Sequence, residues 1–137
     1  MIEYRDTLPD KLQHARLFAT TGWNDDYRLD ADQLLEAIGG SWYAVSAYDG
    51  GELVGFGRLI SDGVLHALVV DLIVLPERQG QGIGSAILRR LVERCVARGV
   101  RDVQLFCARG KRGFYEKMGF EARPADAPGM QLVTSDR

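Results

Sequence analysis

The chain has 137 residues, 46% of them hydrophobic and 26% charged, which is enough for a domain with a full hydrophobic core and excludes a disordered or low-complexity protein. Its net charge of −2 hides a segregation: residues 1–77 hold 13 acidic and 5 basic side chains, whereas residues 78–123 hold 4 and 11. A basic segment attracts polyanions and an acidic one attracts cations, although such runs can also be merely solvated surface.

The sequence lacks the features of a secreted, membrane or metal-binding protein. Residues 1–6 contain no cationic stretch followed by an apolar run. The longest apolar run, residues 64–75, is too short to span a bilayer as a helix. Cys95 and Cys107 have no CxxC spacing, and with two histidines they make a poor metal-ligand set. We therefore expect a cytoplasmic protein with reduced thiols, no metal and no membrane association.

The first third of the chain predicts a short strand and two helices. Residues 2–5 favour a strand, and the apolar spacing after Pro9 predicts a helix as far as Thr20. The polar and aromatic residues 21–29 predict a loop. Asp30 is a suitable N-cap for a helix over residues 31–38, which Gly39 and Gly40 would end.

Three strands are predicted next. Residues 42–48 and 52–60 are rich in β-forming residues and flank a hairpin turn at Asp49-Gly50-Gly51. Residues 65–75 are apolar almost throughout, which is typical of a central strand covered on both faces. Pro76 would end this strand.

The second half begins with the most clearly amphipathic helix. Its predicted apolar stripe consists of two rows of residues four apart: Ile83, Ile87, Leu91 and Cys95, and Leu88, Val92 and Val96. Gly99 would end it. We then expect a strand over 103–107, a helix over 111–117, a strand after Met118-Gly119-Phe120 and an edge strand over 130–133.

This element order predicts a single α/β (α+β) domain over residues 1–137, with a mostly antiparallel sheet and flanking helices. The strands at 65–75 and 103–107 should form a central parallel pair, because the helix between them makes a right-handed crossover.

A glycine-rich turn, Gln79-Gly80-Gln81-Gly82-Ile83-Gly84, joins the central strand to this helix. The first N–H groups of a helix lack intrahelical partners, and the helix dipole adds positive charge there. Glycine lets an oxyanion approach the backbone, and the Arg78 and Gln79 side chains could donate as well. We expect the turn to hold the pyrophosphate of a nucleotide-like cofactor. The alternative is a helix start that serves packing alone.

The spacing of the turn argues against two common nucleotide motifs. A dinucleotide fingerprint needs G-x-G-x-x-G, but here Ser85 occupies the place of the third glycine. The nearest following acid, Asp102, precedes a strand instead of ending one. The P-loop pattern is absent.

Two segments resemble the GCN5-related N-acetyltransferase (GNAT) family. Gln79-x-x-Gly82-x-Gly84 is similar to its acetyl-CoA motif [QR]-x-x-G-x-[GA], and residues 113–120 (GFYEKMGF) are similar to its A-x-x-F-Y-E-K-x-G-F segment. The resemblance covers roughly residues 42–120. It implies an N-acetyltransferase that uses acetyl-CoA, with a GNAT-like sheet whose central strand splays from the next parallel strand.

The resemblance also assigns the cofactor contacts. The turn would bind the pyrophosphate, the central strand would pair with the pantetheine arm, and two aromatic residues would flank the thioester. The implied residues are Leu72, Ile73, Val74, Arg78, Gln79, Gly80, Gln81, Gly82, Ile83, Gly84, Ser85, Phe114 and Tyr115. Arg109, Lys111 and Arg112 are candidates for the distal phosphates.

Acetyl transfer to an amine needs an oxyanion donor, a proton for the leaving thiolate and a deprotonated amine. The backbone N–H of Ile73 or Val74 could bind the oxyanion. Tyr115 matches the family's general acid, although it could be an ordinary half-buried tyrosine. Asp71 could accept the amine's proton through water or be a structural carboxylate. His66 and a water chain are the other candidates.

In this family the first two helices and their loop, here residues 22–28, form most of the acceptor site. Trp23 and Tyr27 offer aromatic faces and Asp26 offers negative charge, which suits a cationic primary amine, although these aromatics could simply cover the core. The short chain favours a small acceptor. We expect no nucleic-acid binding, and monomer and homodimer stay open. The alternatives are a non-catalytic acyl-CoA sensor of the same fold, or transfer of a longer acyl chain or to a hydroxyl.

Overall fold

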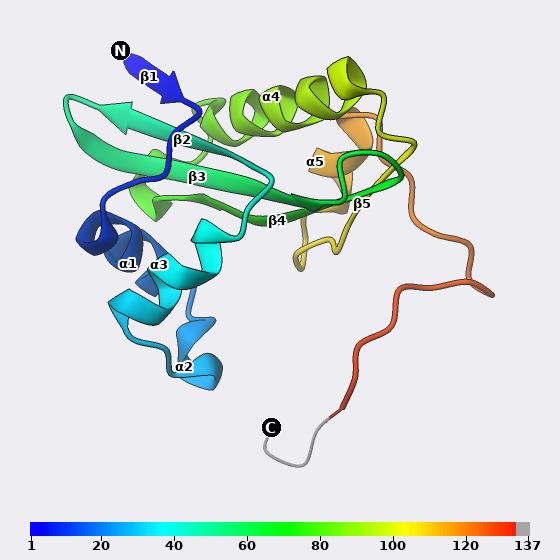
Figure 1. Cartoon of the computed structure of the whole chain (residues 1–137), viewed down its shortest axis with the longest axis horizontal. Coiled ribbons are helices and arrows are strands. Elements are labelled where there is room, and N and C mark those ends of the chain that lie inside the picture. Colours follow the sequence, from blue (N-terminus) through cyan, green and yellow to red (C-terminus); the bar gives the residue numbers. More distant parts are fainter. Residues whose placement is uncertain (134–137) are drawn as a thin grey trace. The chain divides into compact units, whose positions relative to one another are not determined.

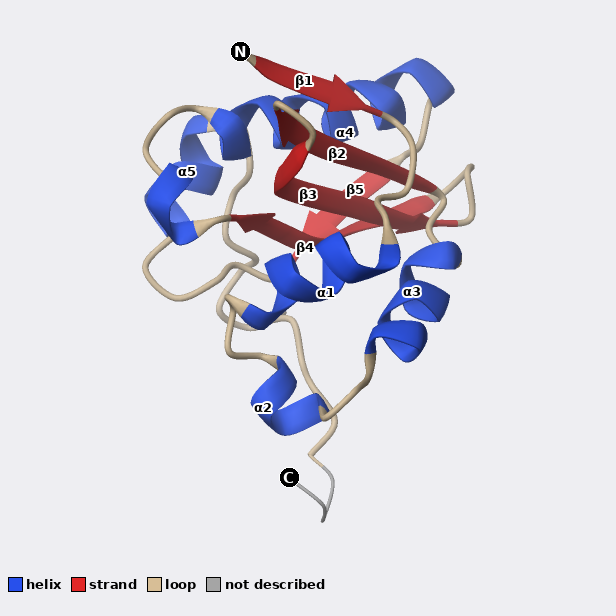
Figure 2. Ribbon diagram, turned by 90° about the vertical axis from the view of Figure 1, so that its left-hand side faces the viewer, coloured by secondary structure: helices blue, strands red, loops and turns tan. Residues whose placement is uncertain are grey.

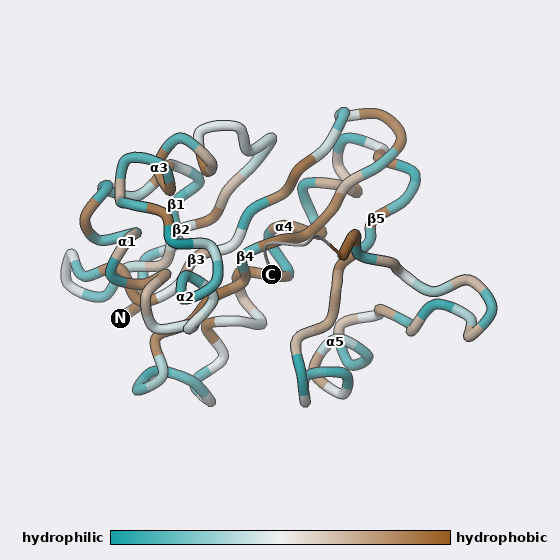
Figure 3. The backbone as a smooth tube through the Cα atoms, turned by 90° about the horizontal axis from the view of Figure 1, so that it is seen from below, coloured by the Kyte–Doolittle hydropathy of each residue, from teal (hydrophilic) through white to brown (hydrophobic). Residues whose placement is uncertain are grey.

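The computed structural model describes residues 1–133 and contains two compact units, residues 1–105 and the segment from Phe106 onward (Figure 1). The elements of the first unit are β1 (Ile2–Arg5), α1 (Lys11–Ala19), α2 (Asn24–Tyr27), α3 (Ala31–Gly39), β2 (Tyr43–Asp49), β3 (Glu52–Ser61), β4 (His66–Val74), a 3₁₀ turn η1 (Pro76–Arg78), α4 (Ile83–Arg98) and β5 (Asp102–Leu105). The second unit contains α5 (Arg112–Lys117), a helix of mixed hydropathy (Figure 3). The prediction of one domain over the whole chain stays a prediction.

The five strands of the first unit form one sheet in the order β1-β2-β3-β4-β5. Neighbouring strands are antiparallel except β4 and β5, which are parallel. This sheet, with its flanking helices, confirms the predicted fold class. The parallel pair lies at one end of the described sheet.

Helices cover both faces of the sheet. Helix α4 lies on one face, and α1 and α3 lie on the other (Figures 1 and 2). The buried stripe of α4 consists of Ile83, Ile87, Leu88, Leu91 and Cys95. Val96 was predicted to belong to this stripe, but it is 73% exposed. Each step of four residues turns about 40° beyond a full revolution. The row that begins at Leu88 has therefore rotated away from the sheet when it reaches Val96.

Two glycines of β3 let α4 lie close to the sheet. A Cβ added to Gly57 would lie 2.8 Å from the Ile87 side chain and 3.1 Å from the Leu91 side chain. A Cβ added to Gly55 would lie 2.9 Å from Ile87. These positions need glycine because the neighbouring helix occupies the space of a side chain.

The helices of the first half begin close to the predicted positions, with one addition. Helix α1 begins at Lys11 because the Asp10 side chain accepts hydrogen bonds from two backbone N–H groups of its first turn. Asp30 caps α3 as predicted, in a capping box with Gln33. The predicted loop over residues 21–29 contains the short helix α2, which ends where Arg28 adopts a φ of +56°.

The two C-terminal strands that the sequence predicted are absent from the described residues. Residues 118–133 contain no strand, and the side chains of Met130, Leu132 and Val133 are exposed. Pro124 and Pro128 remove backbone donors from this segment, which weakens any pairing in a sheet. Within the described residues, no helix has the length and apolarity needed to cross a membrane.

Replacing Gly57 by Ala should lower the free energy of unfolding by about 1–3 kcal/mol, because the added methyl group must displace α4 from the sheet. The measurement is chemical denaturation followed by circular dichroism. Gly39→Ala is the matched control, because a Cβ there meets nothing within 4 Å and Gly39 has no positive φ. Equal stability of the two variants would contradict this account of the packing.

Candidate functional site

The glycine-rich turn ends in a helix N-terminus that carries no side-chain cap. Gly82 is the N-cap residue of α4, and among residues 1–133 no side chain caps the first N–H groups of this helix. Gly80 and Gly82 have φ angles of +81° and +84°, and a Cβ on either would meet nothing within 4 Å. These glycines are therefore required by backbone conformation, and the space beside them is open. The arrangement fits a bound anion.

The side chains flanking the turn have partners within the first unit. The Gln79 side-chain amide donates to the carbonyl oxygen of Val74 at 3.2 Å. The Arg78 guanidinium pairs with the Asp49 carboxylate at the end of β2, and this hydrogen bond lowers the pKa of Asp49. Arg78 thus reaches back to the sheet. The Ile83 side chain belongs to the core, so only its backbone can contribute to an anion site.

Strand β4 carries a β-bulge in its second half. Arg58 pairs with Val70, and Phe56 pairs with Ile73, so Gly57 alone stands opposite Asp71 and Leu72. Asp71 has a φ of +56°, which is rare for a residue other than glycine and least unfavourable for Asn and Asp. The segment after the bulge is therefore shifted by one residue relative to regular pairing.

The bulge is followed by an open strand edge. The described pairing of β4 with β5 runs from His66 with Asp102 to Val69 with Leu105, and it does not continue along β4. The next N–H after β4, that of Leu75, donates to the Val54 carbonyl of β3. Backbone groups alternate along a strand, so Ile73 faces β3 and Val74 faces the open edge. Of the two predicted oxyanion donors, Val74 is the one on that edge.

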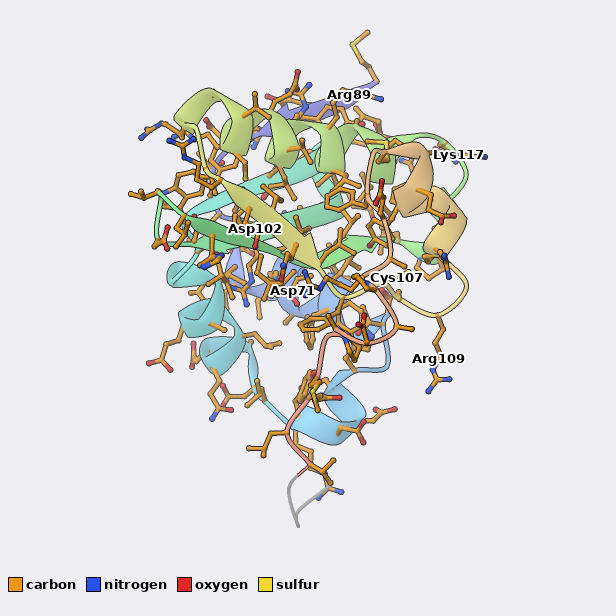
Figure 4. All side chains as sticks on the ribbon, turned by 90° about the vertical axis from the view of Figure 1, so that its right-hand side faces the viewer. Asp71, Arg89, Asp102, Cys107, Arg109 and Lys117 are labelled. Carbon is orange, nitrogen blue, oxygen red and sulfur yellow. The ribbon has the colours of Figure 1, made fainter. Side chains whose placement is uncertain are left out.

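The carboxylate of Asp71 is held by an arginine that the sequence analysis did not identify. Arg58 Nε lies 2.7 Å from Asp71 Oδ2, and the two side chains are only 13% and 21% exposed. Arg58 Nη1 also donates to the Ala37 carbonyl at 3.3 Å and to Ser41 Oγ at 3.4 Å. Asp71 thus lies on the side of the sheet that faces α1 and α3 (Figure 4). An arginine within the otherwise uncharged residues 53–61 was the available signal in the sequence.

A buried histidine lies on the same side. His14 of α1 is 1% exposed, and its ring packs edge-on against Phe56 at 5.2 Å between centroids. Neither ring nitrogen has a hydrogen-bond partner among the described residues. Burial lowers the pKa of His14, the charge of Asp71 opposes this shift, and that of Arg58 adds to it. The imidazole is therefore neutral at neutral pH.

The other candidate base lies at the opposite end of β4. His66 Nδ1 is 3.4 Å from Asp102 Oδ2, and both side chains are well exposed. Four residues, 67–70, lie between His66 and Asp71 along the strand. This position favours a surface pair over a proton acceptor at the open edge.

The predicted acceptor residues lie on and before α2. The Trp23 ring packs edge-on against Phe18 at 5.8 Å and is 38% exposed, so it partly covers the core. Tyr27 is 57% exposed, and Asp26 lies exposed in the first turn of α2. The Asn24 side chain closes this loop by exchanging two hydrogen bonds with the backbone of Leu29. One aromatic therefore serves packing while the other, with the carboxylate, is available.

The second unit holds the predicted general acid within an aromatic cluster. The Tyr115 ring packs edge-on against Phe114 and Phe120, with centroid distances of 5.0 and 6.2 Å. Burial raises the pKa of Tyr115, and the charge of Cys107 adds to this shift. The phenol therefore stays protonated through the neutral range, as a proton donor must. Arg109 (Figure 4) is exposed in the same unit. Lys111 is exposed as well.

A family comparison adds independent information about the chain. The model of the Acetyltransferase (GNAT) family matches residues 7–120, which is most of the sequence. The match includes β4, the glycine-rich turn, α4 and α5.

Curated relatives from plants match part of the chain. One, named GCN5-related N-acetyltransferase 2, chloroplastic, from Arabidopsis thaliana, is 38% identical over 79 residues, or 58% of this chain and 31% of that protein. Another, named Serotonin N-acetyltransferase 2, chloroplastic, from Oryza sativa subsp. japonica, is 38% identical over 85 residues, or 62% and 42%. The matched region thus spans less than half of either relative.

The chloroplast names of these relatives bear on where the protein resides. The sequence predicted a cytoplasmic protein from the lack of a targeting pattern in its first residues. The relatives from Arabidopsis thaliana and Oryza sativa point instead to a plastid, so the cytoplasmic prediction is wrong. A targeting segment cannot be judged from a chain that spans only part of its relatives.

Among solved structures, a GNAT-family acetyltransferase from Streptococcus pneumoniae TIGR4 superposes on this chain with a TM-score of 0.84. The two sequences are 31% identical, and the superposition covers 98% of this chain and 99% of the other. With the family match and the open strand edge that leads to an uncapped helix, this similarity identifies the protein: the chain belongs to the GNAT family of acetyltransferases.

Proposed function

We propose that this protein transfers an acetyl group from acetyl-CoA to the primary amine of a small acceptor, by direct attack within a ternary complex. The observation that carries the proposal is the continuity of the open edge of β4 with the uncapped N-terminus of α4. An extended pantetheine arm needs backbone partners along a strand edge, and a pyrophosphate needs N–H groups at its end. The first unit supplies the strand edge and the N–H groups one after the other along the chain.

The cofactor contacts follow from these two features. The arm pairs with the edge of β4 at Leu72 and Val74, and the N–H groups around Gly82, Gly84 and Ser85 receive the pyrophosphate. Gly80 and Gln81, which are both exposed residues, precede them in the turn. The open space around the turn glycines supports this placement, because a side chain there would meet the phosphates.

The transfer itself uses few groups. The amine nitrogen attacks the thioester carbonyl carbon, the N–H of Val74 on the open edge stabilises the developing oxyanion, and the C–S bond breaks. Tyr115 gives its proton to the leaving thiolate, with Phe114 beside it. The amine releases its proton to water, since the Asp71 carboxylate is occupied by Arg58.

We place the acceptor amine near Trp23, Asp26 and Tyr27. The exposed ring of Tyr27 and the carboxylate of Asp26 suit an ammonium group before it loses its proton. The name of the rice relative refers to serotonin, a small aromatic amine, which supports an acceptor of that size.

A thiol-release assay tests this function directly. The protein is incubated with acetyl-CoA and a panel of arylalkylamines, polyamines, aminoglycosides and peptide amines, and products are checked by mass spectrometry. We expect acetylation of at least one small primary amine. Turnover of peptides alone would contradict the acceptor class. Binding of CoA without turnover of any amine would instead indicate a sensor.

The anion site predicts a specific effect of Gly82→Ala. Alanine at a φ of +84° costs about 1–2 kcal/mol, and relief of this strain rotates the N–H groups of the first turn away from the ligand. Calorimetry should show CoA binding weakened by about tenfold or more. The matched control is Gly99→Ala at the other end of α4, with a φ of +70° and equally open surroundings. It should lose similar stability and keep its CoA affinity; equal affinities in both variants would refute the site.

The acid role of Tyr115 predicts that Tyr115→Phe lowers kcat by about 10–100-fold, with little change in KM for acetyl-CoA. The ring packing against Phe114 and Phe120 survives this change, so only the proton is lost. Tyr4→Phe, which removes a hydroxyl from β1, is the control and should behave as wild type. An unchanged kcat in Tyr115→Phe would refute the assignment of Tyr115 as the general acid.

A further inference from the structure

The bulged residue of β4 is an aspartate in a conformation that glycine adopts more easily. Asp71 has a φ of +56°, and a non-glycine residue accepts this only at an energetic cost. A side chain at this position makes the backbone conformation less favourable than glycine would. The carboxylate must therefore contribute something that glycine could not.

That contribution is a bond across the bulge. Arg58 follows Gly57, the single residue opposite the bulge, and its Nε donates to Asp71 Oδ2 at 2.7 Å. The pair thus joins β3 to β4 at the point where their regular pairing is interrupted. Because both side chains are largely buried, the interaction is less screened by water than a surface pair.

The same guanidinium reaches a helix. Arg58 Nη1 donates to the carbonyl of Ala37 in the last turn of α3 and to Ser41 Oγ just beyond it. A cation at a helix C-terminus also interacts favourably with the helix dipole. One arginine therefore fixes the bulge of β4 relative to α3, which follows the segment that carries the proposed acceptor residues.

From this geometry we infer that Asp71 and Arg58 act as a positioning pair. They hold the bulge so that β4 presents Val74 on its open edge, and Asp71 does not serve as the proton acceptor. This inference rests on the proposed acetyltransferase function. A two-residue bulge that relaxed to regular pairing would shift the following segment by one residue and turn these backbone groups toward β3.

The test compares four variants by CoA affinity, kcat and thermal unfolding. Asp71→Asn keeps tolerance of positive φ and an oxygen that can accept from Arg58, but it cannot take up a proton. Asp71→Ala and Arg58→Met each break the pair. Arg58→Lys keeps the charge but loses the fork that bridges to α3.

For a positioning pair, Asp71→Asn keeps kcat and CoA affinity within about threefold of wild type. Asp71→Ala and Arg58→Met lose up to about 100-fold in kcat and weaken CoA binding by about tenfold, with Arg58→Lys in between. Cys95→Ala, which leaves a cavity near the C-terminal end of α4, provides a control of lowered stability that should keep its CoA affinity.

Two results would overturn the inference. In the first, Asp71→Asn loses kcat as fully as Asp71→Ala while both bind CoA normally, which is the behaviour of a general base with its loss of about 100-fold or more. In the second, Arg58→Met binds CoA as wild type does. If the wild-type protein binds CoA but acetylates no amine, the proposed function fails. The CoA affinities of the same variants then still test whether Asp71 and Arg58 position the bulge. If wild type binds no CoA, both proposals fall.

Discussion

The extra residue in strand β4 is the constraint on which the arrangement of the first unit depends. Between two paired positions, β3 supplies Gly57 alone, whereas β4 supplies Asp71 and Leu72. Because backbone groups alternate along a strand, one added residue decides which of them face the neighbouring strand beyond it. Ile73 then pairs toward β3, and Val74 faces the edge that β5 leaves open. On the other face, the missing side chain of Gly57 lets α4 lie close to the sheet.

Much of this arrangement follows from sequence patterns because the determinants are local. The apolar run of β4, the proline after it and the spacing of Gly80 and Gly82 are each read within a few residues, and the structure bears out the strand, the turn and the helix start. The four-residue spacing of α4 was also informative, except at Val96, where helical drift carries the row into solvent. Capping of α3 by Asp30 is another local interaction that the sequence specifies.

The parts that were not predicted depend on interactions between distant residues. A bulge leaves no trace in a largely apolar run, so the sequence left Asp71 as either a proton acceptor or a structural carboxylate. Its partner Arg58 is 13 residues earlier, and only the antiparallel register brings the two together. The two C-terminal strands were predicted from β-forming residues alone, but a strand also needs an available neighbour and backbone donors, which the prolines of that segment reduce. The cofactor and acceptor assignments of the remaining site residues stay predictions.

Contacts within the first unit also change the meaning of the charge segregation. Arg78 pairs with Asp49, and two arginines of α4, Arg90 and Arg94, lie over the rings of Tyr4 and Tyr43 at 4.5 and 4.7 Å. The ion pair offsets the charge of Arg78, whereas the ring contacts hold Arg90 and Arg94 against residues of the acidic half without cancelling their charges. Fewer basic side chains are therefore free to reach a polyanion than the net charge of the segment implies. The partial positive charges on the N–H groups at the start of α4 stay available, because no side chain in the described part of the chain caps them. The backbone of the turn, more than the basic side chains after it, therefore has the properties of a pyrophosphate site.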